Sequence, residues 1–264
     1  MAFITNEGAQ IYWDEQGDGE PILLIMGLGY PSDMWFRTRQ LLSTRYRTIA
    51  LDNRGVGRSD TPAGPYPISL MASDAAAVLD AAGFESAHVY GVSMGGMIAQ
   101  EFTLQYPARV RSLILGCTAA GGPNVVRAEP EVLNYLMQQN PSAEEALEGS
   151  VPFLYGPNTS RQLIDEDLAR RKKWLPKREA FLAQLQGIMA WESFSRLDQI
   201  KAPTLVIHGD SDRLIPPGNS KLIAERIPGA KLVMLPGAGH VYTTDQTALA
   251  QEVITDFLSG VESV

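Results

Sequence analysis

Apolar runs that fit buried strands alternate with helical patterns along most of the chain, and this alternation limits the possible folds more than any other feature. The strand candidates are rich in aliphatic residues, and they lie at 2–5, 10–15, 22–26, 46–52, 87–92, 110–117, 203–209 and 230–236. The helix candidates lie at 69–82, 94–106, 217–227 and 244–259. Such alternation predicts an α/β fold with a mainly parallel, eight-stranded sheet and helices on both faces.

Residues 121–200 break this alternation. The stretch contains no strand candidate as clear as its neighbours, and its apolar residues fall at helical intervals in 131–139 and 178–190. We therefore expect a helical insertion between two strands of one core, which is formed by residues 1–120 and 201–264.

The chain is acidic, with a formal net charge of −8 over 264 residues, which argues against nucleic acid or an anionic membrane as the main partner. The basic run ARRKKW at 169–174 lies beside acidic residues and is interpreted as a solvated helix face. A single cysteine, Cys117, excludes an internal disulfide and is typical of a reducing compartment. The first residues do not resemble a secretory signal, and no apolar run approaches the roughly 18 residues of a membrane span. We expect a cytoplasmic protein that is a monomer or a small homo-oligomer.

One serine stands at a corner between a predicted strand and a predicted helix, in the sequence Gly91-Val92-Ser93-Met94-Gly95. A strand that turns at once into a helix forces the corner residue toward positive φ, and side chains two residues away would collide. The glycines remove those side chains, so the serine hydroxyl can stand clear of the backbone at a helix N-terminus. A dinucleotide-binding loop would need glycine where Ser93 stands, and the segment also lacks the lysine of a phosphate-binding loop.

A serine hydroxyl needs a base to become a nucleophile, and the chain has three histidines. His88 lies at the start of its predicted strand and His208 lies within another, so both are interpreted as structural. His240 follows the strand at 230–236, at the carboxyl edge of the sheet, where active sites of parallel sheets lie. We therefore expect His240 to be the base.

The base in turn needs a carboxylate to orient it. Asp210 and Asp212 both follow the strand at 203–209, so both carboxylates are candidates. Either one gives the order serine, acid, histidine along the chain, which is the order of the α/β-hydrolases.

These motifs together resemble the α/β-hydrolase fold family, and in particular the 3-oxoadipate enol-lactonase-like hydrolases and small carboxylesterases. GVSMGG resembles the nucleophile elbow of the family, and GAGH its histidine loop. GDSD resembles the acid loop G-x-x-D, which implies that Asp212 is the acid rather than Asp210. LDNRGVGRSD at 51–60 resembles a structural turn of the family. The resemblance thus implies a triad of Ser93, Asp212 and His240, with residues 121–200 as a cap over the pocket.

The same resemblance implies an oxyanion hole made of the backbone N–H groups of Leu28 and Met94. Many members have His-Gly after the third strand, whereas this chain has Met26-Gly27. Because both donors are backbone groups, the methionine does not remove the hole.

The predicted function is hydrolysis of a small to medium carboxylic ester or lactone through an acyl-enzyme, without a cofactor or a metal. The same triad also fits C–C bond hydrolysis, perhydrolysis or cofactor-free haloperoxidation, and the fold alone fits a ligand receptor with slow turnover. A metal site at His208, Asp210 and Asp212 lacks the usual supporting ligands. Cys117 has no glycine corner around it and is interpreted as a buried apolar residue rather than a nucleophile.

Overall fold

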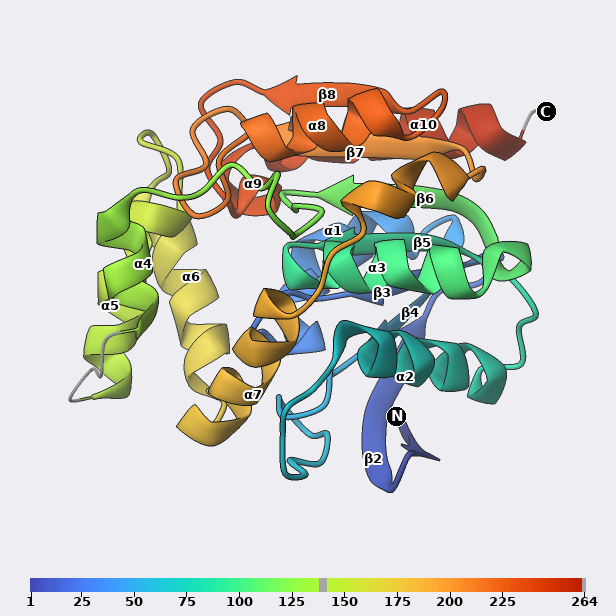
Figure 1. The fold of residues 1–264 in the computed structure, drawn as a ribbon, viewed down its shortest axis with the longest axis horizontal. Helices are drawn as coiled ribbons and strands as arrows, with labels where there is room; N and C mark the ends of the chain where they lie inside the picture. Colours follow the sequence, from blue (N-terminus) through green and yellow to red (C-terminus); the bar gives the residue numbers. More distant parts are fainter. Residues whose placement is uncertain (138–141, 263–264) are drawn as a thin grey trace.

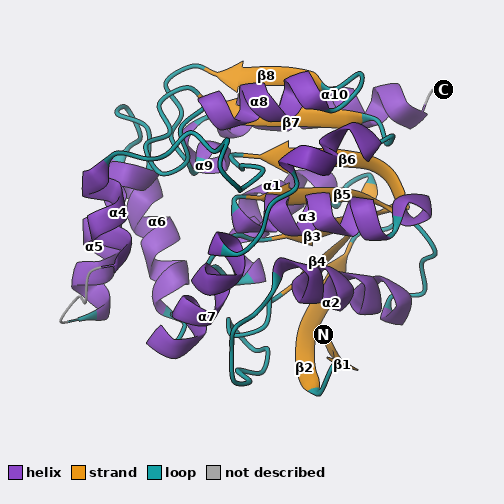
Figure 2. Ribbon diagram, in the orientation of Figure 1, coloured by secondary structure: helices purple, strands orange, loops and turns teal. Residues whose placement is uncertain are grey.

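The computed structural model describes residues 1–137 and 142–262, and these contain one eight-stranded sheet, as the sequence predicts (Figures 1 and 2). The strand order is β1-β2-β4-β3-β5-β6-β7-β8. The strands are β1 (Ala2–Asn6), β2 (Ala9–Gln16), β3 (Glu20–Ile25), β4 (Tyr46–Leu51), β5 (Ala87–Val92), β6 (Val110–Gly116), β7 (Thr204–Gly209) and β8 (Lys231–Leu235). Only the pairs β1–β2 and β2–β4 are antiparallel, so the carboxyl ends of β3 to β8 share one edge of the sheet.

Helices cover both faces of this sheet (Figure 1). The helices outside the insertion are α1 (Phe36–Leu42), α2 (Ile68–Ala81), α3 (Met94–Gln105), α8 (Gly218–Arg226), α9 (Tyr242–Asp245) and α10 (Thr247–Glu262), with short 3-10 turns η1 (Ser32–Trp35), η2 (Pro107–Arg109) and η3 (Phe194–Gln199). Side chains alternate along β3: Leu23 and Ile25 pack in the core under α2 and α3, whereas Ile22 and Leu24 pack in the core under α1 and α10. None of the described helices is long and apolar enough to cross a membrane.

In the described part of the chain, four helices lie between β6 and β7, beyond the carboxyl edge of the sheet (Figure 1). They are α4 (Pro130–Met137), α5 (Ala143–Leu154), α6 (Arg161–Lys172) and α7 (Arg178–Met189). The helical patterns predicted at 131–139 and 178–190 correspond to α4 and α7, although residues 138 and 139 lie outside the described residues.

The basic run at the end of α6 is only partly a solvated face, which corrects the sequence interpretation. Lys172 and Lys173 are exposed, but Arg170 and Arg171 are half-buried. The Arg170 guanidinium lies 3.7 Å from the centre of the Phe36 ring, and that of Arg171 lies 4.4 Å from the Tyr30 ring. The two arginines thus pack part of their side chains between α6 and the Phe36 and Tyr30 rings.

The turn at 51–60 supports the loop that follows β3, as expected of a structural motif. The Asp52 side chain is fully buried, and its Oδ1 accepts hydrogen bonds of 2.7 Å from both the N–H and the hydroxyl of Ser32. Its Oδ2 accepts from the N–H and the guanidinium of Arg58. At Gly57, where φ is +61°, a Cβ would lie 2.2 Å from Asp52 Oδ2, so only glycine lets the turn close on the carboxylate.

Candidate active site

Ser93 lies at the corner between β5 and α3 with φ 56° and ψ −125°, so the predicted positive φ is confirmed. A Cβ on Gly91 would lie 2.1 Å from the carbonyl oxygen of Gly95, and one on Gly95 would lie 2.0 Å from that of Ile25. The Ser93 N–H donates to Gly116 O at 2.9 Å, which fixes the corner against β6. The glycines are therefore required because backbone passes through the space of a side chain, as the sequence predicts.

Asp212 follows β7, and its buried carboxylate accepts four hydrogen bonds. Oδ1 accepts from the backbone N–H groups of Leu214 and Ile215, both at 2.9 Å. Oδ2 accepts from His240 Nδ1 at 2.8 Å and from His208 Nε2 at 2.9 Å. Burial by itself would raise the pKa of Asp212, but the charge of His240 and the hydrogen bonds of both imidazoles lower it to about 2.

His240 lies in the loop between β8 and α9, and it is buried. Burial acts to lower the pKa of its imidazole, but the adjacent Asp212 carboxylate outweighs this and raises the pKa well above the ordinary value. The loop is held from behind by Asp245, whose Oδ2 accepts from the Gly239 N–H at 2.7 Å. The insertion also contacts this loop, because the N–H of Val241 donates to Leu154 O at 2.9 Å.

Ser93 and His240 follow β5 and β8 at the same edge of the sheet, and Cys117 follows β6, which lies between those two strands. Cys117 follows Gly116, which accepts the Ser93 N–H, and its thiol is among the groups that act to raise the pKa of the His240 imidazole. It is buried, as expected, and has an unusual φ of 39°. Within the described residues no hydrogen bond joins the Ser93 hydroxyl directly to His240. Such bonds often tighten only when a substrate is bound.

The loop after β3 lies directly over Ser93, where the sequence places an oxyanion donor. A Cβ on Gly27 would lie 2.8 Å from Ser93 Cβ and 3.3 Å from Ser93 Oγ, so the backbone leading to Leu28 is close to the hydroxyl. Met94 is the first residue of α3, where backbone N–H groups have no partner within the helix. In the described part of the chain no acceptor is bonded to the N–H of Leu28 or of Met94.

Two side chains that the sequence argument did not place at the site support it. Gln184, on α7 of the insertion, accepts from the Gly29 N–H at 2.9 Å and donates to Arg54 O at 2.9 Å, so it fixes the loop after β3. His208, interpreted as structural, bonds directly to Asp212. Its position one residue before the end of β7 was the only signal in the sequence.

The remaining candidates lie away from this cluster. Asp210 is exposed and its Oδ1 accepts from the Gly237 N–H and the Ser211 hydroxyl rather than from a histidine. His88 is buried, with Nδ1 2.8 Å from Ser112 Oγ. Within residues 1–137 and 142–262, no group of His, Cys, Asp and Glu side chains is arranged to hold a metal ion.

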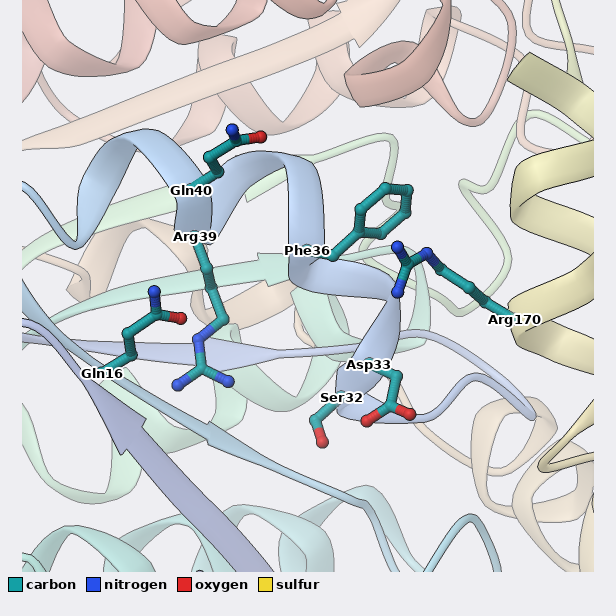
Figure 3. Close-up of a pocket in the computed structure, with 7 residues that line it drawn as sticks. All are labelled: Gln16, Ser32, Asp33, Phe36, Arg39, Gln40 and Arg170. Carbon is teal, nitrogen blue, oxygen red and sulfur yellow. The ribbon is translucent and has the colours of Figure 1, made fainter. Parts of the chain in front are cut away.

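A cavity of about 490 Å³ lies beside α1 and η1, at the end of α6 (Figure 3). It is lined by Gln16, Ser32, Asp33, Phe36, Arg39, Gln40 and Arg170, and by none of the candidate triad. Its charged groups already have partners: Asp33 accepts from Arg58 at 2.7 Å, and Arg39 donates to Asp14 at 2.6 Å. We assign this cavity no catalytic role.

The fold and the matched motifs define the class of protein: the chain belongs to the α/β hydrolase fold family, which it matches over residues 20–242. It is 32% identical to an Azorhizobium caulinodans protein whose name proposes it as a carbamate hydrolase, RutD, over 99% of this chain and 100% of that protein. It is 33% identical to a poly(3-hydroxyalkanoate) depolymerase of Ectopseudomonas oleovorans, over 90% of this chain and 84% of that protein. Among solved structures it resembles a thermophilic esterase from Thermogutta terrifontis, with a TM-score of 0.84 and 26% identity over 98% and 97% of the two chains.

Proposed function

We propose that this protein is a serine hydrolase that cleaves small to medium carboxylic esters or lactones through an acyl-enzyme. The observation that carries the proposal is the buried Asp212–His240 pair, 2.8 Å apart. It lies at the same edge of the sheet as Ser93, which stands at a strained corner after β5. Membership of the hydrolase family and the similarity to an esterase support it.

In this mechanism Asp212 fixes the tautomer of His240. Because Nδ1 faces a carboxylate oxygen, Nδ1 carries the proton and Nε2 is free to accept one. His240 Nε2 removes the hydroxyl proton as Ser93 Oγ attacks the substrate carbonyl carbon, and the carbonyl oxygen becomes an oxyanion. The N–H groups of Leu28 and Met94 stabilise that charge. His240 then protonates the leaving alcohol, and water activated by the same base hydrolyses the acyl-enzyme.

The insertion at 121–200 acts as the cap over this site. Three of its contacts reach the loops that carry the proposed machinery: Gln184 bonds to the N–H of Gly29, Leu154 O accepts from Val241, and the N–H of Gly156 donates to Asp245 at 2.9 Å. A capped site excludes bulky polymers and keeps water from the oxyanion donors.

A carbamate is the second candidate substrate class, because the relative named as a carbamate hydrolase matches over the full length of both chains. Carbamates and esters both present a carbonyl carbon to the nucleophile, so the same residues would act on either. The difference lies in the leaving group and in how the cap accommodates it.

A substrate panel tests the proposal. It comprises p-nitrophenyl esters of increasing acyl length, aliphatic and enol lactones, an aryl N-alkylcarbamate and a long-chain triglyceride, each assayed with the wild type and with Ser93→Ala. We expect short esters or lactones to be cleaved fastest by the wild type and not detectably by Ser93→Ala. Efficient triglyceride cleavage would contradict the capped site. Equal activity of the two proteins, or binding without turnover of any compound, would reject the proposed function.

A further inference from the structure

His208 makes more specific contacts than a core histidine needs. The side chain is fully buried at the end of β7, and its Nε2 lies 2.9 Å from Asp212 Oδ2 and 2.9 Å from Ile215 O. Its Nδ1 bonds to the hydroxyl of Ser220, which is also fully buried, on α8. A buried polar side chain satisfied on both ring nitrogens is fixed in one orientation.

These contacts fix the tautomer of His208. Both partners of Nε2, a carboxylate oxygen and a backbone carbonyl, are acceptors, so Nε2 carries a proton. The Ser220 hydroxyl can then donate to Nδ1, which makes the ring a better donor at Nε2. The direction of donation therefore runs from Ser220 through His208 to Asp212.

We propose that His208 is a positioning residue for the triad, which orients the Asp212 carboxylate and moderates its attraction for the proton of His240. The proposal rests on the proposed function. Its basis is that His208 and His240 donate to the same oxygen, Oδ2, while Oδ1 is occupied by two backbone N–H groups. Every lone-pair direction of the carboxylate thus has a donor.

Loss of the His208 donor changes the charge that His240 experiences. Oδ2 would keep only His240 as a donor, and the less stabilised carboxylate would hold the imidazolium proton more strongly. The pKa of His240 would therefore rise. Among the described residues, Asp212 and Cys117 act on the pKa of His240, and Asp245 accepts from the N–H of the preceding Gly239. A shift of His240 is compared with the state of these groups.

His208 also holds the acid loop in place. Ile215 donates its N–H to Asp212 Oδ1 and accepts Nε2–H of His208 with its carbonyl oxygen, so one side chain ties both ends of the turn at 212–215 to β7. A purely structural histidine would contribute only this second effect, and its loss would lower stability without moving the pKa of His240.

The test compares His208→Leu, which removes the donor, with His208→Gln, whose side-chain amide places an N–H near the position of Nε2. For His208→Leu we expect kcat to fall by roughly 10- to 100-fold, the range found for outer partners that orient the ligands of metal sites. KM should change little, and the acidic limb of the kcat/KM profile should move to higher pH. His208→Gln should recover most of kcat and return the limb toward its wild-type position.

Ser220→Ala keeps His208 in place and provides the test if His208→Leu does not fold. A smaller shift of the acidic limb in the same direction is expected, because the ring loses the hydroxyl that strengthens its donation. NMR titration of the His240 ring gives the same pKa without any substrate, so the outcome does not depend on the proposed function. An unshifted His240 pKa in His208→Leu, or in Ser220→Ala where that is the variant that folds, would overturn the proposal. Equal impairment of the Leu and Gln variants would do the same.

Discussion

Asp212 and Asp167 have equally buried side chains but opposite electrostatic environments. Asp212 lies at the candidate catalytic edge, and Asp167 lies where the insertion meets the core. Asp212 and Asp167 are each 0% exposed at the side chain. The pKa of Asp212 is lowered to about 2, whereas burial raises the pKa of Asp167 above its ordinary value. Burial alone therefore does not decide the charge of either group.

The donors explain the difference. Asp212 accepts four N–H hydrogen bonds, of which two come from the backbone of its own turn. Asp167, on α6, accepts from the Thr244 hydroxyl at 2.7 Å, from the Tyr155 hydroxyl at 3.2 Å and from Arg37 at 3.3 Å. Hydroxyl donors and a longer guanidinium contact compensate less of the desolvation. The candidate catalytic edge is preorganised for an anion, while the junction is a polar contact that holds the insertion on the core.

The largest effect is expected from a substitution that removes this preorganisation while keeping the shape of the side chain. Asp212→Asn should lower kcat by a factor on the order of 10⁴, because an amide can donate to His240 and favour the wrong tautomer. Asp210→Asn is the matched control two residues away, and its exposed carboxylate makes no contact with His240. Steady-state kinetics on the best ester of the panel compare the two variants. A greater loss in Asp210→Asn would assign the acid to that residue instead.

The pH dependence of stability gives a smaller effect, which tests the same comparison between Asp212 and Asp167. The folded pKa of Asp212 is lowered, so its contribution is present above the unfolded value and is lost as pH falls toward 2. The folded pKa of Asp167 is raised, so its contribution is present at acid pH and is lost as pH rises through that pKa. The difference in Tm between wild type and Asp212→Asn should therefore shrink as the pH is lowered below about 4, the unfolded value of an aspartate, whereas that for Asp167→Asn should grow as the pH is lowered through the raised pKa of Asp167.

Thermal unfolding between about pH 2 and pH 7 measures both differences, and the expected changes are about 2–4 °C per kcal/mol for a chain of this size class. Asp165→Asn, an exposed position on the same helix that pairs with Arg161, controls for loss of charge on α6 and should show almost no pH-dependent difference. Parallel slopes for Asp212→Asn and Asp167→Asn would contradict the contrast between the two regions.

The fold and the serine corner were predictable because they follow from local rules. Gly91 and Gly95 flank Ser93 because neighbouring backbone occupies the space that their side chains would take. The sharp turn that causes this is predicted by the sequence, and it also gives Ser93 its positive φ. The inner strands β3 to β7 were predicted because strands buried on both faces leave long aliphatic runs.

The supporting contacts were not predictable, because they join residues that only the tertiary structure brings together. Gln184 lies 155 positions from Gly29 along the chain, and its amide reaches that loop only after α7 docks. His208 was seen in its strand, but strand position does not show that its ring turns toward Asp212 rather than into an apolar layer. The burial of Arg170 and Arg171 likewise depends on the packing of α6 against the Phe36 and Tyr30 rings.

The most direct test of the central claim is covalent labelling of the proposed nucleophile. The wild type, Ser93→Ala and Asp210→Asn are incubated with a small fluorophosphonate, and intact mass and peptide mapping locate the adduct. The account predicts one adduct per chain on Ser93 in the wild type and in Asp210→Asn, and none in Ser93→Ala. An adduct on another residue, including Cys117, or undiminished labelling of Ser93→Ala, would contradict it.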